Sequence, residues 1–378
     1  MHIMYRELVE AGEAAYVRGE SLDALRQVDV VVFDCDGVLL DVRGSYIRAV
    51  ARTVSLLVEA FTGSAVPEAM VDPALNYAYK QTGGFNNDWS LAYALTMRTL
   101  AEAGDALTEI NGVAEAAAGI QELPARLEYI RRHRPEAHIP VDGLYQKLYG
   151  FAGELDDTGH QAADRHLGHL EPVKRALNYR AGVGESLVST LFEEVLLGSR
   201  LFQEAFGLSA SLTSCDRGFV EDTEVVITES TIRDLEALLG GRRLGVASGS
   251  IRSTAYNVLG PLAHMIPREA QVWHDDVDEF AGATGRGDLH KPNPYPLVAA
   301  CEPYRPYLCV LYVGDTAADH LMARRAGGVF LFAGVYGVAH GAEETKRGFL
   351  EAGCDIVASN VNQLPGIMRQ ARLLDPGG

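Results

Sequence analysis

The stretch VVFDCDGVLLD, residues 31–41, ends an apolar run with two carboxylates, Asp34 and Asp36, followed at once by Gly37. An apolar run of this length bounded by Asp and Gly is typical of a strand buried on both faces. The acid pair has two interpretations. It can cap a tight turn in which Gly37 takes a positive φ, or it can form part of a reactive site at the end of the strand.

Short strand-like runs alternate with helical segments, such as residues 317–326, in the last third of the chain. This alternation predicts parallel strands joined by helical crossovers, with residues 29–33 forming one of the strands. Residues 3–26 show helical spacing of apolar positions and are expected to form a helix that leads into that strand. The other strand-like runs are RLGVAS (243–248), CVLYVG (309–314), GVFLFAG (328–334) and CDIVAS (354–359).

Residues 44–228 have a different composition, which is rich in Ala, Leu and Glu. Their apolar residues recur at helical spacing, as in Leu123, Leu127 and Ile130. Strand-like alternation is scarce there, so this segment is expected to be helical. The sequence therefore predicts an α/β fold with a Rossmann-like parallel sheet. Its core is built from residues 1–43 and 229–378, and a helical domain of about 185 residues, 44–228, interrupts it.

The composition restricts the class of protein. With 378 residues, 47% hydrophobic and 22% charged, the chain can form a sizeable core. A formal charge of -18 argues against partners such as nucleic acid or an anionic membrane. No segment reads as a signal peptide or a membrane span, so a cytoplasmic location is expected. The five cysteines form no C-x-x-C pair, which argues against a disulfide framework or a structural zinc site.

Polar residues follow the predicted strands at their carboxyl ends, where open parallel sheets bind ligands. A lysine precedes a proline in HKPNP, residues 290–294, between the predicted strands 243–248 and 309–314. The residues expected to converge at this edge are Asp34, Asp36, Ser248, Gly249, Lys291, Asp315 and Asp319. Several carboxylates at one place repel each other unless a cation neutralises them. Because the set contains oxygen ligands and no His or Cys, Mg²⁺ is the expected ion.

Four segments in order, DCDGV, ASGS, KPNP and GDTAAD, resemble the four motifs of the haloacid-dehalogenase-like superfamily of hydrolases. Most of its members are aspartyl-phosphate phosphatases. The insertion after the first motif resembles the helical cap of the phosphoglycolate-phosphatase-like branch. Three further segments are similar to those of a poorly characterised subgroup of that branch, namely DVRGSYIRAV (41–50), GGFNNDW (83–89) and LFQEAFG (201–207).

The resemblance implies a role for each acid. Asp34 would attack phosphorus as a nucleophile, and Asp36 would protonate the leaving group and later take a proton from water. Asp315 would bind the metal, and Asp319 would act through water or through Lys291. The expected metal ligands are Asp34, Asp36 through its carbonyl, Asp315 and Asp319.

The resemblance also implies how the phosphoryl group is held. Ser248 and the amide of Gly249 would hold phosphoryl oxygens, and Lys291 would offset the negative charge of nucleophile and phosphate. Ordinary alternatives exist for all three, because Ser-Gly-Ser commonly caps a helix and a lysine before proline is usually a solvated loop residue.

Substrate contacts in the helical domain are predicted in GGFNNDW, because this segment is polar and flanked by glycine. The alternative is an interhelical turn with Trp89 anchored in the helical core. Arg43, directly after the first motif, is a further candidate for the cleft or a hinge. The substrate-binding candidates in this domain are therefore Asn86, Asn87, Asp88, Trp89 and Arg43.

The expected activity is a Mg²⁺-dependent phosphatase for a small phosphorylated metabolite. The second acid, Asp36, argues against a dehalogenase. A phosphomutase of the same fold and a noncatalytic phosphometabolite-binding protein stay open as alternatives, and self-association is undecided. A phosphonate-cleaving enzyme would need a cap lysine, for which Lys80 is weak evidence. The acidic run Asp275, Asp276, Asp278 and Glu279 is expected to be a loop and helix start, and indirect contact with the site is the alternative.

Overall fold

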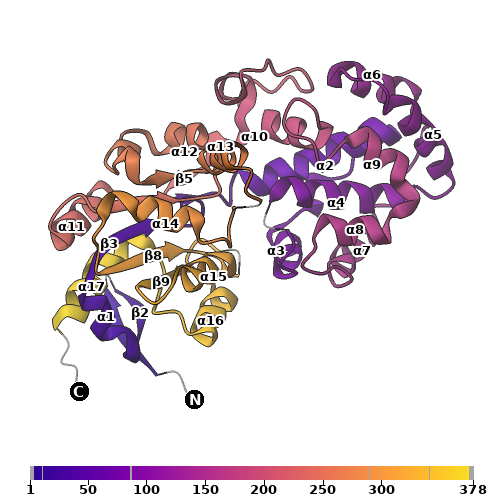
Figure 1. Cartoon of the computed structure of the whole chain (residues 1–378). Coiled ribbons are helices and arrows are strands. Elements are labelled where there is room, and N and C mark those ends of the chain that lie inside the picture. The colour runs from indigo at the N-terminus through magenta and orange to yellow at the C-terminus, as the bar shows by residue number, and fades with distance from the viewer. Residues whose placement is uncertain (1–3, 11, 86, 288, 340, 374–378) are drawn as a thin grey trace. The chain divides into compact units, whose positions relative to one another are not determined.

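The computed structural model describes residues 4–373 except 11, 86, 288 and 340 (Figure 1). The chain divides into two compact units, Met1–Val42 with Thr223–Gly378, and Arg43–Asp222. The boundaries predicted from the sequence are 43/44 and 228/229. The difference arises because strand β5 (Glu224–Val225) pairs antiparallel with strand β4 (Leu40–Asp41), and because Ile227 is buried in the core of the first unit.

The first unit contains an eight-stranded sheet that is mostly parallel, as the sequence predicts. The strands β10, β9, β8, β3, β6 and β7 are parallel to one another. The strands β1 and β2 form an antiparallel hairpin at one edge of the sheet. The strand order is β1 (Tyr5–Glu10), β2 (Glu13–Arg18), β10 (Ile356–Ala358), β9 (Phe330–Val335), β8 (Cys309–Gly314), β3 (Val28–Phe33), β6 (Leu244–Ala247) and β7 (Gln271–Val272).

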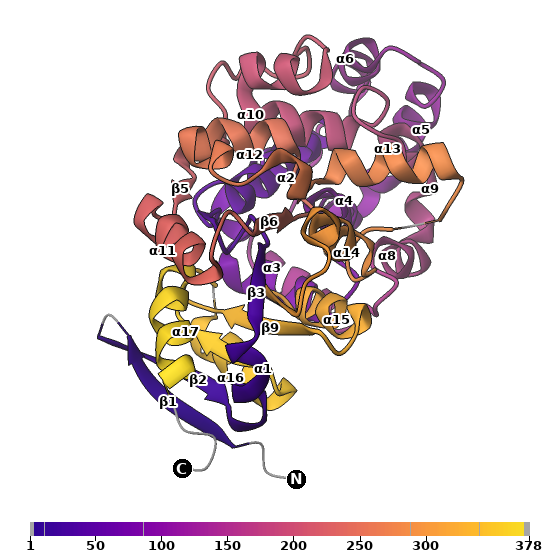
Figure 2. The same ribbon diagram turned by 60° about the vertical axis from the view of Figure 1, so that its left-hand side comes forward.

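Two hydrophobic cores lie on the two faces of this sheet, because alternate side chains of a strand point to opposite faces. Val31 and Phe33 of β3 belong to one core, and Val30 and Val32 to the other. In Figure 2, α11 and α17 lie on one side of β3, and α14 and α15 lie on the other. The first face is covered by α1 (Leu22–Arg26), α11 (Glu229–Leu239), α12 (Arg252–Leu259) and α17 (Leu364–Leu373), and the second by α13 (His274–Thr284), α14 (Tyr295–Cys301), α15 (Ala317–Ala326) and α16 (Ala342–Ala352).

The prediction of a helix over residues 3–26 is wrong for its first two thirds. Residues 5–10 and 13–18 form the β1–β2 hairpin, in which Glu10 pairs with Glu13, and the helical part is a short 3-10 turn, Gly19–Ser21, followed by α1, Leu22–Arg26. Leu8, Ala15 and Val17 are buried and their neighbours are not, which is the period of a strand. Because the segment has few apolar residues, their spacing is compatible with the helical period as well as with the strand period. Gly12, which has φ 83° in the turn, was the stronger signal against a continuous helix.

The second unit, Arg43–Asp222, is helical apart from its turns, within the described residues. Helices α2, α4 and α10 pack against one another at its centre. No helix among the described residues has the length and apolar character needed to cross a bilayer. The α-helices are α2 (Tyr46–Thr62), α3 (Pro73–Gln81), α4 (Asp88–Leu100), α5 (Leu107–Ala117), α6 (Leu123–His133), α7 (Leu144–Ala152), α8 (His160–His166), α9 (Glu171–Leu177) and α10 (Leu187–Phe206).

Helix α10 is kinked at Gly198, which has φ 71° and ψ 169°. A Cβ atom at this position would lie 2.6 Å from both the carbonyl oxygen of Asp216 and the amide nitrogen of Gly218. The backbone of residues 216–218 therefore approaches the kink so closely that only glycine fits.

We expect Gly198→Ala to lower the melting temperature by several degrees, since the backbone conformation alone costs about 1–3 kcal/mol with a side chain. Gly112→Ala in α5 is the matched control, because nothing lies within 4 Å of its added Cβ and helical alanine is favoured over glycine. Equal melting temperatures for the two variants would contradict the steric argument.

Candidate active site

Asp34 lies directly after strand β3, and its backbone still belongs to the sheet. Its N–H donates a hydrogen bond of 2.8 Å to the carbonyl of Val313 in the neighbouring strand β8. The residue is 7% exposed, and its side-chain Oδ1 accepts a hydrogen bond of 2.8 Å from the N–H of Cys35. The sheet thus fixes both the position and the orientation of this carboxylate.

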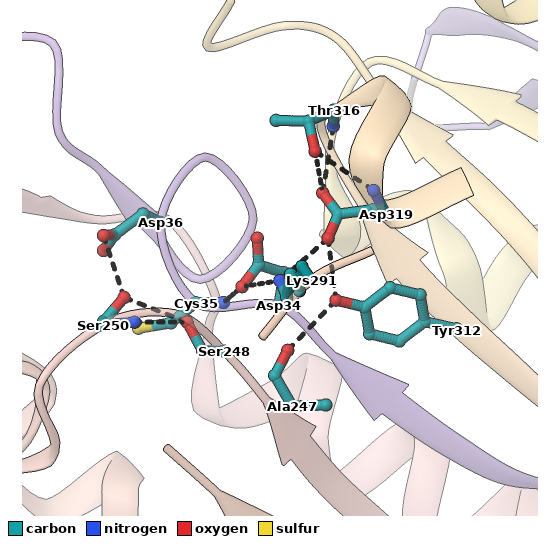
Figure 3. Close-up of polar contacts among 10 residues, drawn as sticks. All are labelled: Asp34, Cys35, Asp36, Ala247, Ser248, Ser250, Lys291, Tyr312, Thr316 and Asp319. Atoms are coloured by element: carbon teal, nitrogen blue, oxygen red, sulfur yellow. Dashed lines mark hydrogen bonds and ion pairs between the residues drawn. The ribbon is translucent and has the colours of Figure 1, made fainter. Parts of the chain in front are cut away.

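Lys291 joins two carboxylates, one directly after strand β3 and one in the first turn of helix α15 (Ala317–Ala326). Its Nζ lies 2.7 Å from Oδ1 of Asp34 and 2.8 Å from Oδ1 of Asp319. Figure 3 shows the ammonium between the two acids. The lysine lies in the loop between α13 and α14, so this ion-pair triad connects three separate segments of the core.

Burial and charge determine the protonation of these groups. Burial raises the pKa of Asp34 to about 7, although Lys291 acts to lower it. For Asp319, burial also acts to raise the pKa, but the charge of Lys291 and the hydrogen bonds to the carboxylate hold it below its ordinary value. Burial acts to lower the pKa of Lys291, yet the two acids hold it above its ordinary value. The ammonium is therefore charged at neutral pH.

Asp319 is completely buried and is held by several donors besides the lysine. Its Oδ1 lies 2.9 Å from the hydroxyl of Tyr312, and its Oδ2 accepts from the N–H and hydroxyl of Thr316 at 3.1 and 2.5 Å. The same Thr316 hydroxyl caps α15 by accepting from the N–H of Asp319. These contacts use both oxygens, so they favour a role for Asp319 in positioning Lys291.

Asp36 lies on the other side of Asp34, away from the lysine (Figure 3). The hydroxyl of Ser250 donates a hydrogen bond of 2.8 Å to its Oδ2. Ser250 is in turn paired with Ser248, whose hydroxyl lies 2.9 Å away. The motif after β6 thus orients the second acid of the motif after β3.

Asp315 follows strand β8 and lies against Gly37. A Cβ atom on Gly37 would come within 2.0 Å of its Oδ2, and Gly37 has φ 77°, so a side chain there is excluded on both grounds. Carboxylate oxygens of Asp34, Asp315 and Asp319 all lie within 4.8 Å of one another. Three acids and one ammonium leave an excess of negative charge, which fits a divalent cation of the Mg²⁺ type bound by oxygen.

The structure brings Asp34, Asp36, Ser248, Lys291, Asp315 and Asp319 to one edge of the sheet, with Gly249 exposed between the two serines. Residues that sequence reasoning missed are Tyr312 and the positioning roles of Thr316 and Ser250. Tyr312 stands in an apolar run, where an aromatic residue signals only a core position. Thr316 carried a signal, since Thr316 and Asp319 have the spacing of a capping box.

Three of the residues predicted to bind substrate, Asn87, Asp88 and Trp89, make contacts with neighbours in the helical unit. Asn87 caps α4 by accepting from the N–H of Trp89 at 2.7 Å, and Asp88 lies 3.3 Å from Nζ of Lys80. The indole N–H of Trp89 donates a hydrogen bond of 2.8 Å to Oε1 of Glu193 in α10. These contacts favour the interpretation as an anchored interhelical turn. Asn86 lies outside the described residues, and Arg43 is exposed at the start of the unit.

Glu193 is a buried acid that sequence reasoning missed. Its side chain lies within the helical core, and burial raises its pKa to about 7, although the hydrogen bond from Trp89 acts to lower it. The native state therefore keeps the proton to a higher pH than the unfolded chain does. Its stabilising contribution is present below about pH 4.5 and is lost as the pH rises through 7.

The family model for haloacid dehalogenase-like hydrolases matches residues 28–327, more than half of the chain. The chain belongs to the haloacid dehalogenase-like hydrolase family. The resemblance predicted from the four motifs is thereby confirmed, and so is the predicted α/β fold. Among curated proteins, none matches the sequence.

The chain is similar to several solved structures, and the one with a TM-score above 0.5 shows the same fold. A structural-genomics target of the Northeast consortium, solved by X-ray crystallography, is 20% identical with a TM-score of 0.65, covering 92% of this chain and 100% of its own. A Lactobacillus plantarum protein provisionally described as a phosphoglycolate phosphatase is 13% identical with a TM-score of 0.36, covering 84% and 91%. A hydrolase from Pseudomonas syringae is 15% identical with the same TM-score, covering 90% and 98%. Scores of 0.36 are too low to support an argument.

We expect Lys291→Met to lower the free energy of unfolding of the first unit by about 3–5 kcal/mol in metal-free buffer, because two buried carboxylates lose their counter-charge. The measurement is urea unfolding. Lys346→Met is the control, since Lys346 faces the exposed Glu343 at 3.7 Å. Adding Asp319→Asn to Lys291→Met should recover part of the loss. Unchanged stability of Lys291→Met would show that the triad is not a stabilising contact.

We expect Glu193→Gln to be more stable than the parent at pH 8, by about 1–3 kcal/mol, since one unit of pKa shift corresponds to about 1.4 kcal/mol. The advantage should shrink as the pH is lowered from 8 to 5. Thermal unfolding across this range tests it, with Glu204→Gln, an exposed acid on the same helix, as control. An advantage that does not vary with pH would contradict the assignment.

Proposed function

We propose that the chain is a Mg²⁺-dependent phosphatase that hydrolyses a small phosphorylated metabolite through an aspartyl-phosphate on Asp34. The observation that supports this most directly is the ion-pair triad. Lys291 holds Asp34 and Asp319 at 2.7 and 2.8 Å, while the carboxylate of Asp315 lies in the same cluster. A nucleophile, a cation and a metal ligand then share one edge of the sheet.

The residues present fit a magnesium ion. Asp34 and Asp315 would hold it with their carboxylates, and Asp36 with its backbone carbonyl. When bound, Mg²⁺ would neutralise charge on a phosphoryl oxygen. The cluster contains no nitrogen or sulfur ligand, which favours this ion over zinc.

The nucleophilic role suits Asp34 for a geometric reason. The Cys35 amide and the Lys291 ammonium both contact its Oδ1, so the carboxylate is held in one orientation. In the first step a carboxylate oxygen bonds to phosphorus and the bond from phosphorus to the leaving oxygen breaks. Ser248, the Gly249 amide and Lys291 would bind the remaining phosphoryl oxygens.

Proton transfer is assigned to Asp36. Its carboxyl group would give its proton to the leaving oxygen, and the carboxylate would then take a proton from the water that cleaves the aspartyl-phosphate. The hydrogen bond from Ser250 fixes the direction of this side chain. The second acid and the metal-ligand Asp315 together favour phosphoryl transfer over dehalogenation.

We expect the full chain to release phosphate from p-nitrophenyl phosphate or acetyl phosphate when Mg²⁺ is present, and to lose this activity in EDTA. Asp34→Asn should lower kcat/KM by at least about a thousandfold, because the amide cannot attack phosphorus. Asp23→Asn, an exposed acid of α1, serves as the matched control. Equal rates for Asp34→Asn and the parent would remove the catalytic proposal.

The substrate class is tested by screening sugar phosphates, phosphoglycolate, nucleotides and amino-acid phosphates for kcat/KM. Release of free phosphate supports the proposal. A product that is an isomeric phosphate would instead make the protein a mutase, and binding without turnover would make it a sensor.

A further inference from the structure

A second cluster of ligand-type side chains lies outside the acidic site. His274 is the first residue of α13, and Asp278 follows one turn later on the same helix. Nε2 of His274 lies 3.2 Å from Oδ2 of Asp278, and Nε2 of His290 lies 2.8 Å from Oδ1. The proposed catalytic roles use none of these three residues.

The two imidazoles are arranged as a pair. Their rings stack with centroids 4.5 Å apart and planes 24° apart, and both direct Nε2 toward the same carboxylate. One nitrogen or oxygen atom from each of the three residues lies within 4.8 Å of the others. Adjacent ligands of a tetrahedral ion with bonds near 2.05 Å are about 3.3 Å apart. The two imidazole-to-carboxylate contacts, at 3.2 and 2.8 Å, lie near this spacing.

The acids beside Asp278 do not compete for this position. Asp275 accepts from the N–H of Arg252 at 3.0 Å, and Asp276 contacts the guanidinium groups of Arg252 and Arg268 at 3.0 and 2.6 Å. Asp278 is the acid of this run that faces the imidazoles. The predicted helix start is present but the predicted loop is not, because all of these acids lie within α13, and their local spacing gives no sign of this cluster.

We propose that His274, Asp278 and His290 form a binding site for a transition-metal ion of the Zn²⁺ type. Two imidazoles and one carboxylate are ligands that suit such an ion, whereas the all-oxygen cluster around Asp34 suits Mg²⁺. The three side chains are 30%, 60% and 31% exposed, so water can complete the coordination shell and the ion can enter from solvent.

The position of the site gives the ion a structural consequence. His290 immediately precedes Lys291, whose ammonium holds Asp34 and Asp319. An ion bound by His290 and by two residues of α13 would tie this loop to the helix. It would therefore restrict the backbone from which the lysine side chain extends.

Co²⁺ titration of the full chain tests the proposal, with excess Mg²⁺ present to fill the acidic cluster. Co²⁺ with nitrogen ligands in a four- or five-coordinate shell absorbs visible light much more strongly than Co²⁺ bound only by oxygen in an octahedral shell. We expect a saturable visible band, displaced by Zn²⁺. We also expect Zn²⁺ to raise the melting temperature, because it binds the native state preferentially.

Substitutions inside and outside the cluster distinguish this site from others. His290→Ala and Asp278→Asn should each weaken Co²⁺ binding at least tenfold, and His264→Ala, a histidine of the same unit outside the cluster, should leave it unchanged. Asp34→Asn should keep the band, so failure of the phosphatase proposal would leave this one standing. A parent without a strong band, or a band that survives both His290→Ala and His274→Gln, would overturn the proposal.

Discussion

The structure of the core edge depends on one ammonium group placed between two buried carboxylates. Asp34 extends from the end of β3, and Asp319 is fixed by the first turn of α15. Without a cation these acids would repel each other at a distance that burial makes costly. Lys291 removes that cost and at the same time locks the loop before α14 to the sheet. Chemistry and local stability are therefore coupled at this point.

This coupling divides the acids of the site by their surroundings. Asp319 has donors on both oxygens and holds the lysine, while Asp36 is turned toward Ser250. Asp315 is pressed against Gly37, where no side chain is tolerated. Identical functional groups thus acquire different duties, because each is held by different neighbours.

The strands and the convergence of their polar ends were predictable because buried parallel strands leave continuous apolar runs followed by polar residues. The hairpin at residues 5–18 was not, since its few apolar positions fit two periods. Tyr312 was hidden within an apolar run, and its contact with Asp319 depends on the fold. His274 and His290 meet only through the turn of the chain after α13, which no local spacing reveals.

The short β4–β5 pair joins the two points at which the helical unit is inserted into the chain. Asp41 and Glu224 stand opposite each other in this ribbon, about 5 Å apart as cross-strand partners are. The chain thus leaves the first unit and returns to it at neighbouring points. The two ends of the helical insertion are therefore held together by paired strands of the first unit, so the length of the insertion places no constraint on the strand order of the main sheet.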